Sequence, residues 1–285
     1  MTSAPISGHT QLAAVIGHPV RHSLSPAIHN AGFASCGLDW VYLAFDVAPG
    51  GAPGALDAMR SLGIVGLSVT MPHKDAVAAA VDETTPAAAN LGAVNCVINR
   101  DGHLTGDNTD GDGFIAGLEA DLALDVAGMS CVIVGAGGAA RAVIDALVRN
   151  GAASVGVVNR TPDKAETAAS LAGGRGRVAG PDEIGTADLV VNATSVGMAG
   201  TAGEGVTPFD TSLLRSGQVV VDLVYEPSVT PLMAAAQRAG CRVGGGLAML
   251  VGQAAVAFTA WTGVDAPVSD MTAAAKKVLA ARGGH

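Results

Sequence analysis

Residues 131–147, which read CVIVGAGGAARAVIDAL, constrain the fold of this chain more than any other segment. Their order predicts a buried strand over Ser130–Val134, a tight glycine turn and a helix over Arg141–Arg149. The turn consists of Gly135, Ala136, Gly137, Gly138, Ala139 and Ala140. Gly135 permits the turn, Gly137 lets the backbone approach a pyrophosphate, and Ala140 takes the helix-packing position of a dinucleotide-binding fingerprint. The free N–H groups at the helix start would bind the phosphates, which favours a cofactor site over a turn without a ligand.

The end of the next predicted strand, Val155–Val158, indicates which dinucleotide binds. Sites for NAD usually carry Asp or Glu here to bind the 2′-hydroxyl of the ribose. This chain has Asn159, Arg160 and Thr161 instead. Arg160 can pair with a 2′-phosphate, its two neighbours can hydrogen-bond to that phosphate, and Lys164 adds charge one turn into the following helix. We therefore predict NADP as the cofactor, with a solvated surface arginine as the alternative interpretation of Arg160.

Short β-rich runs alternate with alanine-rich helical runs, which is typical of an α/β protein with mostly parallel sheets. The strands predicted in the first part are Ala13–Gly17, Val41–Val47, Ile64–Thr70, Val94–Asn99 and His103–Gly106, and the helices are Pro26–Cys36, Gly54–Leu62 and Lys74–Val81. Later strands are predicted at Leu189–Asn192, Val219–Val224 and Arg242–Val243. We place a substrate-binding and catalytic domain at residues 1–110 and a Rossmann-type NADP-binding domain at 111–246. Two helices predicted within residues 247–285, at Leu247–Trp261 and Ser269–Ala281, are expected to return to the first domain.

Composition narrows the possible functions. A chain of 285 residues with 49% apolar residues is long enough for two packed cores. Its formal charge is −9 and its 16 Lys and Arg residues are scattered, which argues against binding nucleic acid or an anionic membrane. The four cysteines form no CxxC pair and the seven histidines lack metal-binding spacing, so we expect no metal site and a reducing, cytoplasmic environment. We expect no secretion signal, because the first residues contain neither a basic nor an apolar region, and no membrane span, because no apolar run reaches the roughly 20 residues that one needs. We expect a small-molecule substrate as partner, and a monomer or homodimer.

Four polar clusters lie at predicted strand ends of the first domain, where α/β proteins bind ligands. They are Ser23–Pro26, Ser68–Lys74, Val94-Asn95 and Gly106–Gly111. Helix capping would explain Ser25 before a proline-started helix, but it leaves Ser23 unexplained. Lys74 stands at a predicted helix start, which is an unfavourable place for a cation. That mismatch favours a functional role for Lys74 over an exposed surface position.

The motifs SLSP, SVTMPHK, GAVN, GDNTDG, GAGGAAR, NRT, NATSVGM, DLVY and GGGLAMLVGQAA occur in this order between about Gly17 and Phe258. As a set they closely resemble the shikimate dehydrogenase family. The resemblance implies a reversible, NADPH-dependent reduction of 3-dehydroshikimate to shikimate in aromatic amino-acid biosynthesis. It also implies two domains with the active site in the cleft between them.

Positions matched to this family imply a role for each motif. Lys74 and Asp110 match the catalytic pair. The matches to substrate-binding residues are Ser23 and Ser25 for the carboxylate, Thr70, Asn95 and Gln253 for the ring hydroxyls or carboxylate, and Tyr225 near the substrate. Further matches to cofactor-binding residues are Ala193, Thr194 and Val224, with Gly246 and Met249 closing around the nicotinamide. We hypothesise that Lys74 donates a proton to the carbonyl during reduction and accepts one in reverse, while Asp110 orients both groups.

Two positions depart from the family pattern. Ser68 stands where the family usually has asparagine, so a contact to a substrate hydroxyl is weakened or bridged by a water. Lys164 replaces an arginine and should bind phosphate less rigidly. Quinate or an aminated shikimate analogue are therefore alternative substrates. A non-catalytic NADP-sensing protein on the same fold is a further alternative, and the presence of both Lys74 and Asp110 argues against it.

Overall fold

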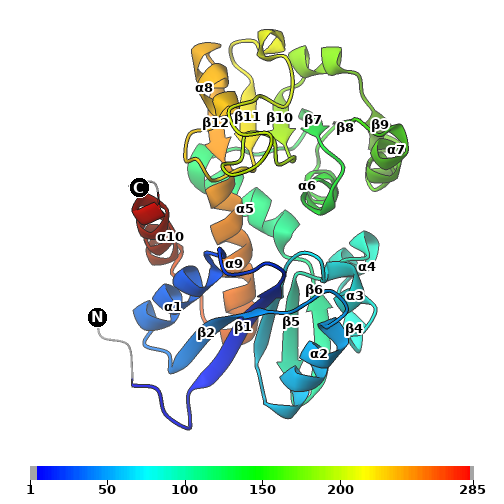
Figure 1. Ribbon diagram of the computed structural model, residues 1–285. Coiled ribbons are helices and arrows are strands. Elements are labelled where there is room, and N and C mark those ends of the chain that lie inside the picture. Colours follow the sequence, from blue (N-terminus) through cyan, green and yellow to red (C-terminus); the bar gives the residue numbers. More distant parts are fainter. Residues whose placement is uncertain (1–4, 283–285) are drawn as a thin grey trace. The chain divides into compact units, whose positions relative to one another are not determined.

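The computed structural model describes residues 5–282, which fold into two compact units (Figure 1). Unit 1 comprises the chain up to Thr109 and again from Val251, and unit 2 comprises Asp110–Leu250. Helix α9 (Gly246–Thr262) begins in unit 2 and ends in unit 1. The second division between the units falls within this helix, after Leu250.

Unit 1 is built on a six-stranded mixed sheet with the strand order β2-β1-β3-β5-β6-β4. Its strands are β1 (Gln11–Gly17), β2 (Trp40–Asp46), β3 (Gly66–Val69), β4 (Glu83–Thr84), β5 (Cys96–Arg100) and β6 (His103–Asp107). Strands β1, β2 and β3 are parallel, whereas β5 is antiparallel to β3 and to β6. The carboxyl ends of β3 and β6 therefore meet the amino end of β5 at one end of the sheet.

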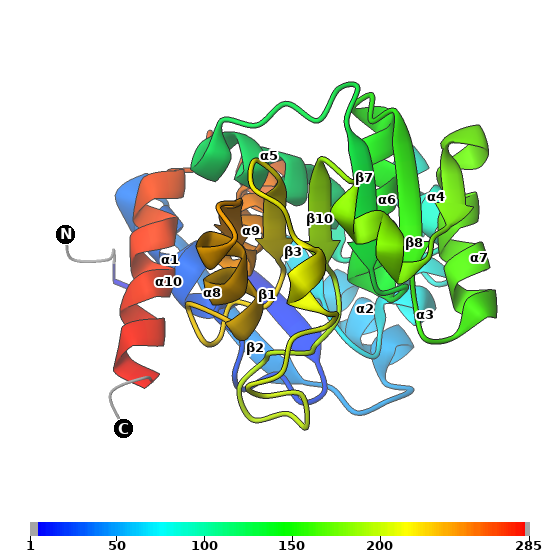
Figure 2. The ribbon, with the colours of Figure 1, turned by 90° about the horizontal axis from the view of Figure 1, so that it is seen from above.

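Helices cover both faces of this sheet. They are α1 (Ser25–Ser35), α2 (Ala52–Ser61), α3 (Lys74–Ala78), α4 (Pro86–Leu91), the later part of α9, and α10 (Val268–Arg282). One face buries Ile16, Leu67 and Val97 against apolar residues of α2, α3 and α4. On the other face the Trp261 ring of α9 lies over Gly66, where any side chain would overlap it. Helix α10 packs beside α1, as Figure 2 shows.

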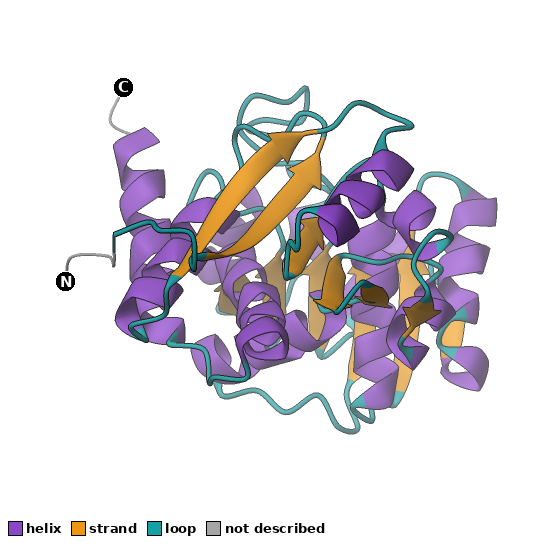
Figure 3. Cartoon of the chain, turned by 90° about the horizontal axis from the view of Figure 1, so that it is seen from below, coloured by secondary structure: helices purple, strands orange, loops and turns teal. Residues whose placement is uncertain are grey.

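Unit 2 is a six-stranded parallel sheet in the order β12-β11-β10-β7-β8-β9, the doubly wound order of a dinucleotide-binding fold. Its strands are β7 (Ser130–Val134), β8 (Ser154–Val158), β9 (Gly176–Val178), β10 (Leu189–Asn192), β11 (Val219–Asp222) and β12 (Arg242–Gly245), and its helices include α5 (Asp110–Leu122), α6 (Gly138–Arg149), α7 (Pro162–Ser170) and α8 (Pro231–Arg238). Along β7, Cys131 and Ile133 face α5, α6 and α7, whereas Val132 and Val134 face α8. Helices flank the strands in each unit (Figure 3).

Helices α4, α5 and α8 lie where the sequence patterns predicted no helix. Helix α5 contains three glycines, which lower its helix propensity. Two of them allow close packing: a Cβ atom on Gly111 would lie 2.8 Å from the backbone oxygen of Ala142, and one on Gly117 would lie 3.0 Å from Ala248. Packing between segments that are distant in sequence therefore outweighs the low local propensity of α5.

Candidate active site

Polar residues gather at one end of the unit 1 sheet. Backbone hydrogen bonds extend the sheet there, since Val69 N donates to Asn95 O at 2.7 Å and Asn95 N donates to Asp107 O at 3.0 Å. Thr70 follows β3 directly, and its N–H donates to Ile16 O at 3.0 Å. Two residues predicted to bind substrate, Thr70 and Asn95, therefore lie at the same end of one sheet.

Asn95 fixes the residue that precedes Asp110. Its Nδ2 donates to Thr109 Oγ1 at 3.1 Å, and its Oδ1 accepts from Thr109 N at 2.8 Å. Both side chains are buried. The neighbouring Val94 donates its N–H to the backbone oxygen of Lys74 at 3.0 Å. The two residues that precede β5 thus hold the backbone of Lys74 and the backbone next to Asp110, the two residues predicted to form the catalytic pair.

Ser23 and Ser25 lie at the start of α1, and the alternative interpretation of Ser25 as a helix cap can be compared with the structure. The helix begins at Ser25 with Leu24 as the N-cap, and no side chain caps it. Instead, Ser23 Oγ accepts from Ser25 N at 3.2 Å. Ser25 is buried and lies near the Tyr42 hydroxyl. The capping interpretation of Ser25 is therefore wrong, because no side chain caps α1.

Tyr42 is a residue of this site that the sequence analysis missed. Its Oη donates to Ser68 Oγ at 2.7 Å, and the Tyr42 and Ser68 residues are 1% and 8% exposed. Asn30 of α1 holds the Tyr42 backbone, donating to its oxygen at 2.9 Å and accepting from its N–H at 2.8 Å. The Tyr42 ring stacks on the ring of His29, with centroids 4.3 Å apart. The chain has only two tyrosines, so one in the middle of an apolar strand was the available signal.

Burial sets the protonation of this cluster. It raises the pKa of Tyr42 far above the usual range, against the opposing effect of hydrogen bonds with Ser68 and Ser25. Burial also lowers the pKa of His29 to about 3, so the ring is neutral at pH 7. Neither ring nitrogen of His29 has a hydrogen-bond partner within residues 5–282. Tyr42 is therefore a neutral donor, and Ser68 keeps its own proton to donate elsewhere.

The segment from Thr70 to Lys74 is anchored on the neighbouring strands. Any side chain at Gly17 would overlap the methyl group of Thr70, so β1 must end in glycine for Thr70 to occupy this position. The Nε2 atom of buried His73 donates to Val47 O at 2.8 Å. Lys74 is the first residue of α3. These contacts hold the backbone on which Lys74 is carried.

The glycine turn of unit 2 has the conformation that its sequence predicts. Gly135 has a φ of +116°, and a Cβ atom there would lie 2.9 Å from Ala193 O, so both conformation and space require glycine. Gly137 is the N-cap of α6 and Gly138 its first residue, and a Cβ on either would have no atom within 4 Å. Ala140 is fully buried in the core of unit 2. This open helix N-terminus fits a pyrophosphate, which would accept hydrogen bonds from the first N–H groups.

The end of β8 presents the residues predicted to bind a 2′-phosphate. Asn159 Nδ2 donates to the backbone oxygen of Thr161 at 3.0 Å and so closes the turn before α7. Arg160, Thr161 and Lys164 are all exposed, and Thr161 is the N-cap residue of α7. Two cationic side chains and a helix N-terminus at one strand end fit a phosphate group.

Asn192 and Asp222 are a second feature that the sequence analysis missed. They are the last residues of β10 and β11, they are register partners, and both are fully buried. Asn192 Nδ2 donates to Asp222 Oδ1 at 2.8 Å. The same carboxylate oxygen accepts from Val224 N at 3.1 Å, so β11 ends at Asp222 and not at Val224 as predicted. A polar residue at the end of a run of valines was the signal for each.

The remaining predicted residues lie after β11 and on α9. A side chain on Gly246 would overlap the backbone oxygen of Leu223, so only glycine allows α9 to start there. Tyr225 is partly buried in the loop that follows Val224. Gln253 lies in the part of α9 that belongs to unit 1, where its backbone oxygen accepts from Thr109 Oγ1 at 3.2 Å.

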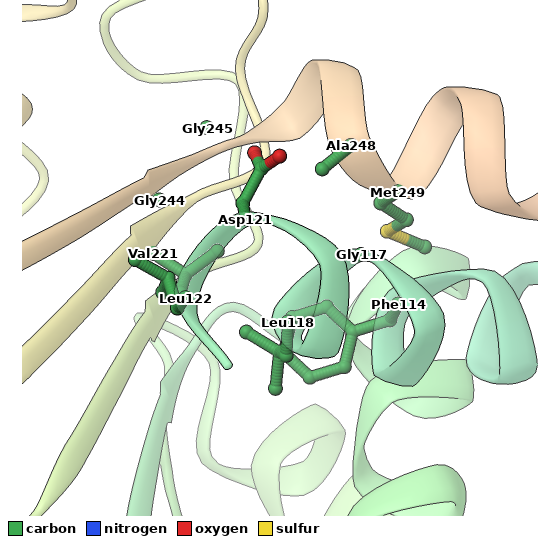
Figure 4. A pocket seen from close by; sticks show the side chains of 10 residues that line it. All are labelled: Phe114, Gly117, Leu118, Asp121, Leu122, Val221, Gly244, Gly245, Ala248 and Met249. Atoms are coloured by element: carbon green, nitrogen blue, oxygen red, sulfur yellow. The ribbon is translucent and has the colours of Figure 1, made fainter. Parts of the chain in front are cut away.

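Met249 lines a small pocket in unit 2 (Figure 4). The other lining residues come from α5, the ends of β11 and β12, and the first turn of α9: Phe114, Gly117, Leu118, Asp121, Leu122, Val221, Gly244, Gly245 and Ala248. The pocket volume is about 10 Å³, roughly what one water molecule requires. It is therefore a packing gap between α5 and α9, and it is too small for a nicotinamide ring.

The described residues contain no grouped metal ligands and no membrane-spanning helix. Within residues 5–282 no three His, Cys, Asp or Glu side chains are grouped so that they could hold a metal ion. No helix in that part of the chain combines the length and apolarity needed to cross a membrane. The four cysteines are free thiols, and burial raises the pKa of Cys131 to about 12.

The doubly wound sheet with its glycine turn, together with a second α/β unit carrying a polar sheet end, defines the class of this protein: a two-unit α/β protein with a Rossmann-type dinucleotide-binding unit. The model of the shikimate dehydrogenase substrate-binding domain matches residues 15–97. The shikimate/quinate 5-dehydrogenase model matches residues 119–236, and the shikimate 5′-dehydrogenase C-terminal domain matches residues 246–276. The chain belongs to the shikimate dehydrogenase family.

Individual relatives support this assignment over the full length. The chain is 47% identical to the NADP(+) shikimate dehydrogenase of Moorella thermoacetica, across 98% of this chain and 97% of that one. The crystal structure of shikimate 5-dehydrogenase from Thermus thermophilus, in complex with NADP(H) and shikimate, superposes with a TM-score of 0.88 at 39% identity, covering 94% of this chain and 100% of that one. A quinate dehydrogenase from Corynebacterium glutamicum, in complex with NAD, gives a TM-score of 0.86 at 37% identity, covering 94% and 99%.

Proposed function

We propose that this protein catalyses the reversible, NADP-dependent reduction of 3-dehydroshikimate to shikimate, a step in aromatic amino-acid biosynthesis. The observation that carries the proposal is the hydrogen-bonded strand end formed by Val94 and Asn95, which supports the backbone of Lys74 and of Thr109 beside Asp110. The family relatives named for this activity cover nearly the whole chain, which supports the same substrate.

In this proposal, unit 1 binds the substrate. Ser23 and Ser25 hold the carboxylate, and the side chains of Thr70, Asn95 and Gln253 bind the ring hydroxyls or the carboxylate. Ser68 donates its proton to a substrate oxygen, because Tyr42 already donates to the Ser68 hydroxyl. Tyr225, after β11, lies near the substrate.

Lys74 moves the proton of the reaction. It donates to the carbonyl oxygen as this becomes a hydroxyl, and it accepts the proton in the reverse direction. Asp110 orients the Lys74 ammonium group and the substrate hydroxyl.

Unit 2 binds NADP. When bound, the reduced nicotinamide supplies the hydride that the substrate carbon accepts. The first N–H groups of α6 hold the pyrophosphate, and Arg160 pairs with the 2′-phosphate, assisted by Asn159, Thr161 and Lys164. Ala193, Thr194, Val224, Gly246 and Met249 surround the nicotinamide half.

We further propose that the protein works in the cytoplasm as a monomer or homodimer. Four free thiols are consistent with a reducing compartment, and sedimentation of the purified protein gives its oligomeric state.

A kinetic panel tests the proposed activity. Shikimate, quinate and an aminated shikimate analogue are each offered with NADP and with NAD, and reduced nicotinamide is followed by its absorbance. We expect the highest kcat/KM for shikimate with NADP. A higher value for quinate would assign the protein to the alternative substrate, and cofactor binding without turnover of any substrate would identify a sensor.

A further inference from the structure

The parallel sheet of unit 2 consists of two halves, β7-β8-β9 and β10-β11-β12. Each half of a doubly wound sheet binds one mononucleotide. Arg160 follows β8 in the first half, so the adenosine 2′-phosphate of the proposed cofactor belongs there. The nicotinamide nucleotide therefore falls to the second half, where Ala193 and Thr194 follow β10 and Val224 follows β11.

We propose that Asn192 and Asp222 are positioning residues that together shape the nicotinamide half of the cofactor site. The proposal rests on the proposed binding of NADP to unit 2. Neither side chain is exposed, so their effect is transmitted through the backbone of the two loops that follow them.

The Asn192 side chain makes four hydrogen bonds to the loop after β10 and to Asp222. Its Oδ1 accepts from Thr194 N at 3.1 Å and from Thr194 Oγ1 at 2.7 Å. Its Nδ2 donates to Asp222 Oδ1 at 2.8 Å and to the backbone oxygen of Val196 at 3.2 Å. The side chain therefore folds the loop after β10 back on itself and ties it to β11.

Asp222 accepts three hydrogen bonds. Its Oδ1 accepts from Asn192 Nδ2 and from Val224 N, and its Oδ2 accepts from Thr230 Oγ1 at 2.6 Å. Thr230 Oγ1 also accepts from Met233 N at 3.2 Å and so caps α8. Burial raises the pKa of Asp222, and its hydrogen-bond donors act in the opposite direction. One carboxylate thus joins the loop after β11, the loop after β10 and the start of α8.

The two loops also contact the rest of the cofactor site. Ala193 N donates to Val134 O at 2.8 Å, and the Ala193 oxygen faces Gly135 of the glycine turn. Leu223 N donates to Asn192 O at 3.0 Å, and its own oxygen faces Gly246. A change at Asn192 or Asp222 must therefore move the backbone that borders the nicotinamide half. The adenine half at the end of β8 has its own hydrogen bonds and should not move.

Calorimetric titration with two ligands tests the proposal. NADP+ occupies both halves of the site, whereas adenosine 2′,5′-bisphosphate occupies only the adenine half. For Asp222→Ala we expect NADP+ affinity to fall by about tenfold or more, since a buried charged hydrogen-bond group is lost. We expect its affinity for the bisphosphate to stay within about twofold, a change under 0.5 kcal/mol. Equal losses for both ligands, or no loss for NADP+, would overturn the proposal.

Two further variants separate positioning from general stability. In Asp222→Asn, the side-chain oxygen can still accept from Asn192 and Val224, and the amide group can donate to Thr230. We therefore expect this variant to retain most of the wild-type affinity for NADP+, unlike Asp222→Ala. Asp188→Ala is the control. The Asp188 carboxylate also accepts hydrogen bonds from a neighbouring segment, from Ser130 N at 2.9 Å and from Ser130 Oγ at 2.8 Å. Asp188 precedes β10, however, and so lies away from the two loops that follow β10 and β11. This variant should change neither affinity, and a selective loss of NADP+ in this control would refute the proposal.

If Asp222→Ala does not fold, Asn192→Ala gives the same test from the other side of the pair. A wild-type protein that binds the bisphosphate but not NADP+ would refute the assignment of the nicotinamide half. A wild-type protein that binds neither ligand would overturn the proposed function itself.

Discussion

The hydroxyl of Tyr42 donates a 2.7 Å hydrogen bond to the hydroxyl of Ser68, and both groups are buried. The pair joins the middle of β2 to the end of β3, and Ser68 is one of the two positions that we expect to depart from the family pattern. The position of the Ser68 hydroxyl is therefore fixed by the hydrogen bond from Tyr42.

The Tyr42–Ser68 pair should be energetically coupled. Ser68→Ala leaves a buried O–H without this partner, so we expect a loss of about 1–3 kcal/mol in the free energy of unfolding. Adding Tyr42→Phe removes the unpaired donor, so the double variant should be less destabilised than the sum of the single changes. Denaturant unfolding of the three variants measures the coupling, and additive changes would contradict it. We also expect Tyr42→Phe to raise the KM for substrate more than the KM for NADP.

Lys74→Ala should abolish most turnover. Loss of a positioned proton donor lowers kcat by about 10²–10⁴-fold, and NADPH affinity should be nearly unchanged. Steady-state kinetics and fluorescence titration of NADPH measure the two effects. Lys277→Ala, on the exposed side of α10, is the matched control. Turnover retained in Lys74→Ala would remove the lysine from the mechanism.

Arg160→Ala should weaken NADPH far more than NADH. A charge-assisted hydrogen bond to phosphate contributes about 1.5–3 kcal/mol, which corresponds to roughly 10–100-fold in the KM for NADPH. NADH has no 2′-phosphate, so its KM should change little. Arg238→Ala, an exposed arginine of the same unit, is the control. Equal weakening of both cofactors would show that Arg160 does not bind the 2′-phosphate.

Gly17→Ala should impair substrate binding. The added methyl group would overlap the side chain of Thr70, which must then move from the end of β3. We expect a higher KM for shikimate with an unchanged KM for NADP. Gly54→Ala is the matched control, because a Cβ there meets no atom within 4 Å and alanine favours the α2 helix. Similar kinetics for the two variants would contradict this role of Gly17.

His29 should make the fold sensitive to acid. Its folded pKa of about 3 lies below the unfolded value of 6.5, so below pH 6.5 the unfolded state binds more protons. The stability associated with neutral His29 is thus complete above about pH 6.5 and is lost as the pH falls toward 3, by at most about 1.4 kcal/mol per pH unit. His29→Phe keeps the stack on Tyr42 and should flatten this dependence, whereas His9→Gln, at an exposed histidine, should not. An unchanged pH slope in His29→Phe would exclude His29 as the cause.

Local patterns located most of the strands and the glycine turn, but they did not predict the short strands β4 and β9. The strand before Gly135 was predicted with its observed bounds, since an apolar run followed by glycine has few alternative structures. Helix α5 was missed because its glycines disfavour a helix until Ala142 and Ala248 are packed against it. Asn192 and Asp222 were missed because each is polar in a run of valines, and their pairing depends on the order of the strands.

A strand, a glycine turn and a helix must be contiguous in the chain to bind a dinucleotide, so the class of protein could be predicted from local patterns. The sequence also contains the groups proposed to react and to bind, including Lys74, Asp110 and Arg160. The side chains that support these groups are known only from the folded chain. Tyr42 reaches Ser68 from a strand two places away in the sheet, and Asn95 reaches Thr109 where the chain enters β5 and leaves β6. Hydrogen bonds between such distant segments leave no local pattern in the sequence.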